Sequence, residues 1–231
     1  MTELFTKVLV IPDIHTKFVL AERIIEKEKP TKIIFLGDYF DEIDDSFEIT
    51  KQTALWLKKS LTKPNRIHLL GNHDLSYLNS KFATSGFSEE KNIIIKNAGV
   101  NLSKLLHYCW INDWLCTHAG LSDNFYRQYN TEKVSVKEFL EKMVNTVSLR
   151  EKAYSCSFFR GGNDPFGGIV WGDYREFADI PNLKQIFGHS KNFRVRQKKD
   201  KLKNSEHICL DTGLQNYAIY ENEVMTIHKI N

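Results

Sequence analysis

Five short motifs made of aspartate, histidine and asparagine carry the residues that could do chemistry in this sequence. In chain order they are DIH at 13–15, GDYFD at 37–41, GNHD at 71–74, THAG at 117–120 and GHS at 188–190. Each motif alone is typical of an ordinary turn or a loop histidine. Their joint occurrence, each after an apolar run, favours one shared site instead. Asp, His and Asn side chains without cysteine suit divalent ions such as Mn, Fe, Zn or Ni, and enough of them exist here for two ions.

Two such ions would support the hydrolysis of a phosphate ester. A carboxylate that bridges them holds them roughly 3.5–4 Å apart, and the pair lowers the pKa of a shared water and clamps a phosphoryl group for in-line attack. The stretch KIIFLGDYFDEIDD places a dense group of acids at a strand end: Asp38, Asp41, Glu42, Asp44 and Asp45. Because clustered carboxylates repel one another, we interpret this acidic cluster as facing metal cations.

Each motif needs a strand to deliver it, and the sequence offers suitable apolar runs. They are KVLVIPDIH, KIIFLGD, RIHLLGNHD, WLCTHAG, LKQIFGHS and HICLDTG. Short apolar runs without alternation predict strands that are covered on both faces. In open α/β sheets, ligands gather outside the carboxyl ends of strands. We therefore expect these strand ends, which carry Asp, His or Asn, to converge on one site.

Helical patterns lie between the runs. Residues 17–29 predict one helix, ended by Pro30, and a second helix ends near Pro64. The second has Phe47, Ala54, Leu57 and Leu61 on one face, and a third has a face made of Val136, Phe139, Leu140, Met143, Val144 and Val147. The alternation of strands and helices predicts an α/β fold with parallel strands in its first half. The C-terminal segment predicts two strands joined by a hairpin at 221–223. We found no repeat or linker, so residues 1–231 are expected to form a single domain.

The composition sets further bounds. Apolar residues make up 42% of the chain, and 32 Lys plus Arg face 29 Asp plus Glu, so neither disorder nor an obligatory polyanionic partner is indicated. The four cysteines form no CxxC pair, which favours reduced thiols and a cytoplasmic location. No apolar run is long enough to span a membrane. The oligomeric state is not readable from the sequence.

The five motifs, in this order, resemble those of the calcineurin-like metallophosphoesterases, and specifically the phosphoprotein-phosphatase branch with its bacterial and phage enzymes. The resemblance runs from Asp13 to about Asp211. It implies a four-layer α/β sandwich of two mixed sheets flanked by helices, and two divalent ions with manganese as the first choice. The implied metal ligands are Asp13, His15 and Asp38 for the first ion, with Asp38 bridging to the second ion, whose shell Asn72, His118 and His189 complete.

The same resemblance implies the catalytic pair and the branch. His73 would be the general acid that protonates the leaving oxygen, and Asp41 would orient it, since a carboxylate beside imidazole raises its pKa and fixes its tautomer. The GHS motif lacks the second histidine of broader GHxH relatives because residue 191 is Lys, which also favours the phosphatase-like branch.

One residue departs from the family pattern. Relatives in the branch read GDxxDRG, where the arginine binds substrate phosphate in a contact of about 1.5–3 kcal/mol, but this chain has Glu42 at that position. Such a change should weaken a dianionic monoester more than a diester. Either Glu42 turns away to solvent or another cation supplies the charge. Arg160 in FFRGGNDPFGG is the candidate phosphate-binding residue, Arg175 is a weaker one, and Trp171 is expected to be a pocket wall.

Two neighbouring features allow alternatives. The run at 194–204 is rich in lysine and arginine and could guide an anionic macromolecule, although a solvated loop between two strands is the simpler interpretation. Its lack of interleaved aromatics weakens a nucleic-acid platform. The aromatics near Arg160 could line a substrate cleft, but residues of this kind are more often core: Phe158, Phe159, Phe166 and Trp171.

We therefore predict a binuclear-metal phosphoesterase that hydrolyses phosphomonoesters by attack of a metal-bound hydroxide, plausibly a serine/threonine protein phosphatase. A diadenosine tetraphosphatase-like nucleotide hydrolase and a nucleic-acid phosphodiesterase are the alternatives, and Glu42 slightly favours such diester or anhydride substrates. The expected partner is a phosphorylated protein or a nucleotide; nucleic acid is possible but not favoured. A non-catalytic scaffold on the same fold is unlikely because His73 and every implied ligand are present.

Overall fold

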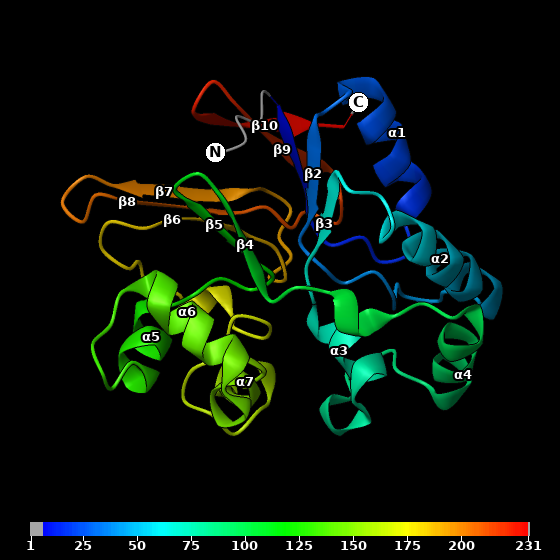
Figure 1. The fold of residues 1–231 in the computed structure, drawn as a ribbon, viewed down its shortest axis with the longest axis horizontal. Helices are drawn as coiled ribbons and strands as arrows, with labels where there is room; N and C mark the ends of the chain where they lie inside the picture. The colour runs from blue at the N-terminus through cyan, green and yellow to red at the C-terminus, as the bar shows by residue number, and fades with distance from the viewer. Residues whose placement is uncertain (1–6, 231) are drawn as a thin grey trace.

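Two mixed β-sheets pack face to face in the computed structural model, which describes residues 7–230 (Figure 1). The first sheet has the strand order β10-β9-β1-β2-β3. In it β1, β2 and β3 are parallel neighbours, whereas β9 runs antiparallel to β1 and to β10. Its strands are β1 (Val8–Ile11), β2 (Lys32–Phe35), β3 (Arg66–His68), β9 (Asn216–Glu221) and β10 (Val224–Lys229).

The second sheet has the order β4-β5-β6-β8-β7. Here β5, β6 and β8 are parallel neighbours, and the edge strands β4 and β7 are antiparallel to theirs. Its strands are β4 (Tyr108–Ile111), β5 (Trp114–Thr117), β6 (Lys184–Phe187), β7 (Arg196–Asp200) and β8 (Ser205–Cys209). The prediction of parallel strands in the first half of the chain is confirmed, and the second sheet adds a parallel set of its own.

The central strands are buried on both faces, as their sequences predict. In β1, Val8 and Val10 belong to the core between the sheets, together with Ile186 and Ile208 of the second sheet. The alternate residues of β1 pack instead in the core that contains the helix side chains Ala21, Ile24, Ala54 and Leu57. Successive side chains of a strand point to opposite faces, so a strand between two layers must be apolar throughout.

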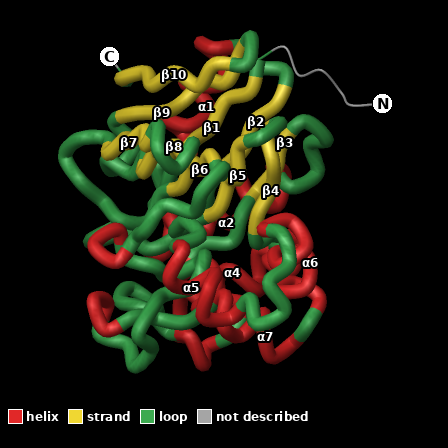
Figure 2. Tube along the Cα trace, turned by 90° about the vertical axis from the view of Figure 1, so that its left-hand side faces the viewer, coloured by secondary structure: helices red, strands yellow, loops and turns green. Residues whose placement is uncertain are grey.

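Helices cover the outer faces and complete a four-layer α/β sandwich, which confirms the expected fold class. In Figure 1, α1 and α2 lie on the side of the first sheet away from the second sheet, and α5, α6 and α7 lie beside the second sheet. Figure 2 shows the strands gathered above and α4 to α7 below them. The helices are α1 (Phe18–Glu28), α2 (Phe47–Ser60), α3 (Asn72–Leu78), α4 (Glu89–Ala98), α5 (Asp123–Tyr129), α6 (Val136–Asn145) and α7 (Val147–Ala153).

Two details of the predicted helix faces are wrong. The face from Val136 to Val147 belongs to two helices, because Thr146 adopts an extended conformation and begins a new helix; Val147 is therefore exposed. Phe47, at the first residue of α2, is also exposed, whereas Ala54 and Leu57 are fully buried. Periodicity indicates a helix face but not the length over which a neighbour covers it.

The basic run at 194–204 is not a loop. Residues Arg196–Asp200 form the edge strand β7, which pairs with β8 through a short turn. Its lysines lie near acids: Lys198 Nζ is 2.9 Å from Asp179 Oδ2, and Lys199 Nζ is 3.6 Å from Glu206 Oε2. Lysines on an edge strand also discourage pairing with other chains.

The predicted C-terminal hairpin is confirmed, with Asn222 and Glu223 as the two residues between β9 and β10. Both have positive φ, of 50° and 64°, as a two-residue hairpin turn requires. No helix in the described part of the chain is long and apolar enough to cross a membrane. The single domain of residues 1–231 stays a prediction, since residues 1–6 and 231 lie outside the described range.

Candidate metal centre

The parallel strands of both sheets deliver the five motifs to one place. Asp13, Asp38 and Asn72 follow β1, β2 and β3, while His118 and His189 follow β5 and β6. Hydrogen bonds join the two sheets at this edge. The Nδ1 of His118 lies 2.8 Å from the carbonyl oxygen of Leu36, and the N–H of His189 donates to Asp13 Oδ1 at 2.9 Å. The expected convergence of strand ends is therefore observed for these motifs.

One group of possible metal ligands consists of Asp13, His15 and Asp38, whose ligand atoms all lie within 4.8 Å of one another. The Nδ1 of His15 is 2.9 Å from the carbonyl oxygen of Phe40, which can only accept a hydrogen bond, so Nδ1 carries the proton. The other nitrogen, Nε2, then presents a lone pair 3.7 Å from Asp38 Oδ2. Imidazole held in this tautomer is ready to bind a metal.

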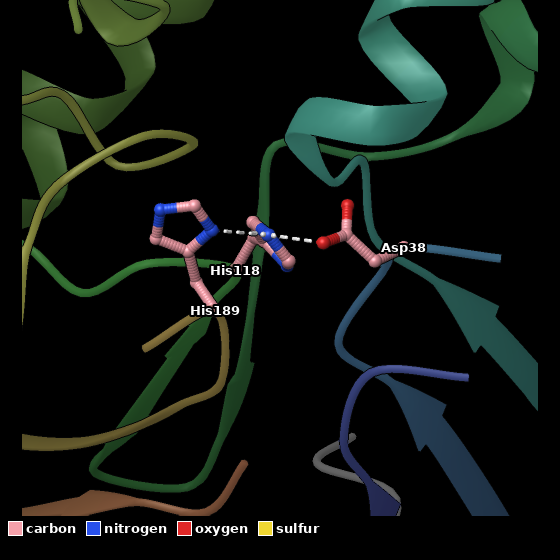
Figure 3. Close-up of side chains that lie close together, drawn as sticks. All are labelled: Asp38, His118 and His189. Atoms are coloured by element: carbon pink, nitrogen blue, oxygen red, sulfur yellow. Dashed lines mark hydrogen bonds and ion pairs between the residues drawn. The ribbon is translucent and has the colours of Figure 1, made fainter. Parts of the chain in front are cut away.

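The second group consists of Asp38, His118 and His189, again within 4.8 Å (Figure 3). Its centre is His118 Nε2, which lies 3.3 Å from Asp38 Oδ2 and 3.2 Å from His189 Nδ1. Asn72 joins them, with its Oδ1 3.1 Å from the same His118 nitrogen. Asp38 belongs to both groups, which is the arrangement that a bridging ligand requires.

The chemistry of these atoms fits cations. His118 Nδ1 donates to a carbonyl, so in the neutral imidazole Nε2 is an acceptor that faces other acceptors. Among the described residues, Asp13 Oδ2 and His189 Nε2 are buried polar atoms without a hydrogen-bond partner. Burial and the nearby carboxylates of Asp211 and Asp38 raise the pKa of Asp13 well above its usual value. Acceptors packed together in this way need a shared positive charge.

The pKa values of His118 and His189 shift in opposite directions. Burial lowers the pKa of His118, but the carboxylates of Asp38 and Asp13 outweigh it and raise that pKa to about 9. For His189, burial and the positive charges at His118 and Arg160 lower the pKa well below its usual value. In the metal-free state a proton on His118 would supply the positive charge that a metal would otherwise supply, so metal binding should release protons.

Three of the candidate ligands have a strained backbone conformation. His15, Asp38 and His189 all have positive φ, of 40°, 51° and 64°, which non-glycine residues adopt rarely. The loop at Asp38 is also packed against Gly71, where a Cβ would lie 2.1 Å from Asp38 Oδ1. Any side chain at position 71 would therefore displace the shared carboxylate.

The residue that fixes this loop, Asp74, was not assigned a role from the sequence. Its fully buried carboxylate accepts the N–H groups of Asp38 and Tyr39, each at 2.8 Å, and that of Gly71 at 3.0 Å. Burial and the neighbouring Asp38 raise the pKa of Asp74 to about 7. Its place in the GNHD motif was the available signal, but an N-terminal helix residue of this type is usually only a cap.

His73 and Asp41 form the pair expected of a general acid and its orienting carboxylate. His73 Nδ1 lies 3.1 Å from Asp41 Oδ2, which can only accept when ionised. Burial lowers the pKa of His73, but the carboxylates of Asp38 and Asp41 outweigh it and raise that pKa. The imidazole is 16% exposed, so it can reach a ligand at the surface of the metal centre.

The acidic cluster faces metals only in part, which corrects our sequence interpretation. Among the described acids of this stretch, Asp38 is the one that joins a candidate metal group. Asp45 pairs with Lys91 at 2.5 Å, and Glu42 forms an ion pair with Lys17. Glu42 is therefore neither directed to solvent nor unpaired, because Lys17, two residues after His15, forms an ion pair with its carboxylate. Neither lysine lies in a motif, and sequence reasoning missed both.

Arg160 lies beside the second ligand group. Its Nε is 2.7 Å from Asp173 Oδ2, and its Nη2 donates to Ser190 Oγ at 2.9 Å, next to His189. Arg175 is more exposed; it donates to the carbonyl of Phe159 at 2.7 Å, and its Nε lies 2.8 Å from Asp173 Oδ1. Arg160 is therefore the arginine directed toward the metal centre.

The aromatics around Arg160 divide into two kinds. Phe158 and Phe159 are 64% and 51% exposed, so the expectation that they are core is wrong. They belong to a short 3₁₀ helix, Phe158–Arg160, in which no residue is buried. Trp171 lines a cavity of about 380 Å³ with Phe82 and Tyr154, but the lining of this cavity includes none of the candidate metal ligands, so its role as a wall of the substrate pocket stays a prediction.

Comparisons with known proteins agree with this geometry. A family model described as calcineurin-like phosphoesterase matches residues 6–193. No curated protein matches the sequence. A serine/threonine phosphatase structure from Saccharomyces cerevisiae, with similarity to human phosphatase PP5, is 13% identical with a TM-score of 0.57, covering 100% of this chain and 81% of that one.

Two further structures share the fold. A cold-active protein-tyrosine phosphatase from a psychrophilic Shewanella species is 14% identical, with a TM-score of 0.55 and coverage of 98% and 81%. A candidate diadenosine tetraphosphatase is 16% identical, with a TM-score of 0.50 and coverage of 99% and 96%. At these identities the likeness establishes the fold alone.

Proposed function

The chain belongs to the calcineurin-like phosphoesterase family, and on that premise we propose that it is a two-metal phosphatase of phosphomonoesters, with phosphoserine or phosphothreonine in proteins as the substrate class. The family makes it a metal-dependent phosphoric ester hydrolase. The observation that carries the finer proposal is the pair of ligand groups that share Asp38, with His73 and Asp41 beside them.

The proposed ligands divide between two sites. Asp13, His15 and Asp38 would hold the first ion, and Asp38, Asn72, His118 and His189 the second. Manganese is the first choice, with Fe, Zn and Ni also suited to these donors. Bound ions of this kind lower the pKa of a shared water and offset the charge of a phosphoryl group.

The protein's own residues supply the remaining chemistry. Asp41 holds the Nδ1–H of His73, which directs the opposite nitrogen, Nε2, away from the carboxylate. A protonated Nε2 would donate to the oxygen of the leaving group as its bond to phosphorus breaks. Burial of the Asp38 and His118 side chains keeps bulk water away from the ligands, which strengthens their interaction with charge.

Arg160 is the proposed phosphate-binding residue. We expect Arg160→Ala to raise the KM for p-nitrophenyl phosphate about 10-fold or more, because a charge-assisted contact to phosphate contributes about 1.5–3 kcal/mol. Steady-state kinetics with manganese would measure it. Arg175→Ala is the matched control because Arg175 pairs with the same Asp173. A raised KM in the control together with an unchanged KM in Arg160→Ala would reject the assignment.

Glu42 should set the preference between esters with one and two negative charges. We expect Glu42→Arg to raise kcat/KM for p-nitrophenyl phosphate about 10-fold relative to bis-p-nitrophenyl phosphate, because it replaces a repelling acid with a phosphate-binding fork. It also frees Lys17 from its ion pair. Glu42→Gln separates the loss of the acid from the gain of the arginine. An unchanged ratio in Glu42→Arg would show that position 42 does not contact substrate phosphate.

Glu42 also favours a second candidate, a diadenosine tetraphosphatase-like nucleotide hydrolase. The Glu42–Lys17 pair leaves less positive charge for a dianionic monoester than an arginine would. A nucleic-acid phosphodiesterase is the weaker alternative, since lysines of the 194–204 run already lie near acids. A scaffold without catalysis is disfavoured by the presence of His73 and all ligands. A cytoplasmic location stays part of the proposal, on the spacing of the cysteines alone.

Product analysis with three substrates, each with manganese, tests the proposal: phosphate released from a phosphoserine peptide, ADP (or AMP and ATP) formed from diadenosine tetraphosphate, and shorter fragments formed from an oligonucleotide. We expect the highest kcat/KM for the peptide. A higher value for diadenosine tetraphosphate would replace the protein phosphatase with the nucleotide hydrolase. A highest value for the oligonucleotide would overturn both in favour of nucleic-acid processing.

A further inference from the structure

A lysine is buried beside Asp41, the carboxylate that orients the proposed general acid, and it lies in a part of the chain where no motif occurs. Lys91 lies in the first turn of α4, and its side chain is 10% exposed. Its Nζ is 2.5 Å from Asp45 Oδ1 and 3.2 Å from Asp41 Oδ1, and it donates to the carbonyl of Gly86 at 3.1 Å. Lysine is rarely buried unless it is paired, so this position is specified by its partners.

The two oxygens of Asp41 have separate tasks. Oδ2 accepts from His73 Nδ1, whereas Oδ1 accepts from the hydroxyl of Tyr77 at 2.6 Å and from Lys91 Nζ. Two donors on one oxygen fix the plane of the carboxylate. With this plane fixed, the other oxygen, Oδ2, is also fixed in position. The His73 imidazole that donates to Oδ2 is therefore held in one orientation.

The backbone around Asp41 depends on the same contacts. Asp41 has a φ of 66°, a conformation that needs support from its surroundings. Gly86 approaches so closely that a Cβ there would lie 2.8 Å from Asp41 Cβ. Lys91 binds the carbonyl of this same glycine. One lysine therefore joins Asp41, Asp45 and the loop that packs on Asp41.

We propose that Lys91, assisted by Tyr77, is a positioning residue for catalysis: it holds the Asp41 carboxylate so that His73 can deliver a proton to the leaving group. The inference rests on the proposed function and extends it to a residue outside the five motifs. None of the contacts that the structure describes for Lys91 involves a candidate ligand group, so Lys91 would act on catalysis through its contact with Asp41. Its effect should thus appear in the proton-transfer step and not in metal binding.

Two substrates with different leaving groups make the effect visible. Phenyl phosphate has a more basic leaving oxygen than p-nitrophenyl phosphate and depends more on proton donation. We expect Lys91→Met to lower kcat for phenyl phosphate about 10-fold, a part of the roughly 10²–10⁴-fold that a general acid supplies. For p-nitrophenyl phosphate the loss should be about 3-fold or less, with KM within about 2-fold for both.

Further variants separate positioning from stability. Lys91→Arg should restore most of the kcat for phenyl phosphate, because it keeps a cation between the same carboxylates. Tyr77→Phe retains the packed ring, removes the second donor to Oδ1, and should show the same selective loss on a smaller scale. Lys96→Met, on the exposed side of the same helix, is the control and should leave both rates unchanged. If Lys91→Met does not fold, Tyr77→Phe and Lys91→Arg carry the test.

The outcomes distinguish the inference from its premise. A selective loss with phenyl phosphate, with bound manganese unchanged, supports the positioning role. Equal losses of kcat for both esters would overturn it, and so would the absence of any loss in both Lys91→Met and Tyr77→Phe. In either case, turnover by the wild-type protein would leave the phosphatase proposal standing. If the wild-type protein with manganese hydrolyses neither ester, the proposed function fails, and this inference with it.

Discussion

Replacing His73 by alanine is expected to lower kcat for phenyl phosphate by about 10²–10⁴-fold, which is the usual contribution of a positioned general acid. The imidazole is the group that Asp41 orients, it is 16% exposed, and its ring centroid lies 5.1 Å from that of the candidate ligand His15. Its backbone N–H donates to Asp38 Oδ1 at 3.0 Å, and alanine retains that contact. The variant should therefore keep its metal while losing its proton donor.

Turnover of phenyl phosphate and p-nitrophenyl phosphate, with metal content measured on the same samples, would check this result. The loss should be larger for phenyl phosphate. Asp41→Asn should give a loss in the same direction because it weakens the hold on His73. His228→Ala, in β10 far along the chain, serves as a control. If His73→Ala turned over both esters at the wild-type rate, His73 would not be the acid.

The second large effect is expected from Asp38→Asn. Asp38 belongs to both ligand groups, so the change weakens two sites at once. We expect kcat to fall about 10³-fold or more, because metal stabilisation of the transition state contributes several kcal/mol and each 1.36 kcal/mol is a factor of ten in rate. Manganese binding should weaken in parallel, to one ion per chain or fewer.

Calorimetric titration with manganese and turnover of p-nitrophenyl phosphate would measure both parts of this prediction. Asp113→Asn is the matched control, since Asp113 is 59% exposed and pairs with Lys184 at the surface. Wild-type stoichiometry in Asp38→Asn would contradict the bridging role. Full activity with reduced stoichiometry would separate catalysis from the second ion and reject the two-metal proposal.

The sequence allowed the ligand groups to be predicted because their residues are of unusual types at predictable places. Asp13, Asp38 and Asn72 each follow a strand of an uninterrupted apolar run, and the carboxyl ends of parallel strands meet at one edge. The family resemblance indicated His118 and His189 as ligands, and the structure shows that the strands before them, β5 and β6, belong to the second sheet. The division of the ligands between two ions came from the family resemblance, and no local pattern shows it because it depends on how the two sheets face each other.

Other features depended on contacts that no local pattern reveals. Lys91 and Lys17 are ordinary lysines on helices, and only the fold brings them to Asp45 and Glu42. The 194–204 run looked like a loop because strong charge hides the edge strand β7. The exposure of Phe158 likewise depends on which segments pack over it, and a local sequence pattern does not show that. Tertiary contact, and not propensity, decides each of these.

The most direct test of the two-metal account is the electron paramagnetic resonance spectrum of the protein loaded with manganese to saturation. A carboxylate bridge at Asp38 would couple the two ions magnetically. The account predicts two bound ions per chain and an exchange-coupled spectrum, replaced in Asp38→Asn by the signal of isolated manganese. A single bound ion, or two ions that give the isolated signal in the wild-type protein, would contradict the shared carboxylate and the mechanism built on it.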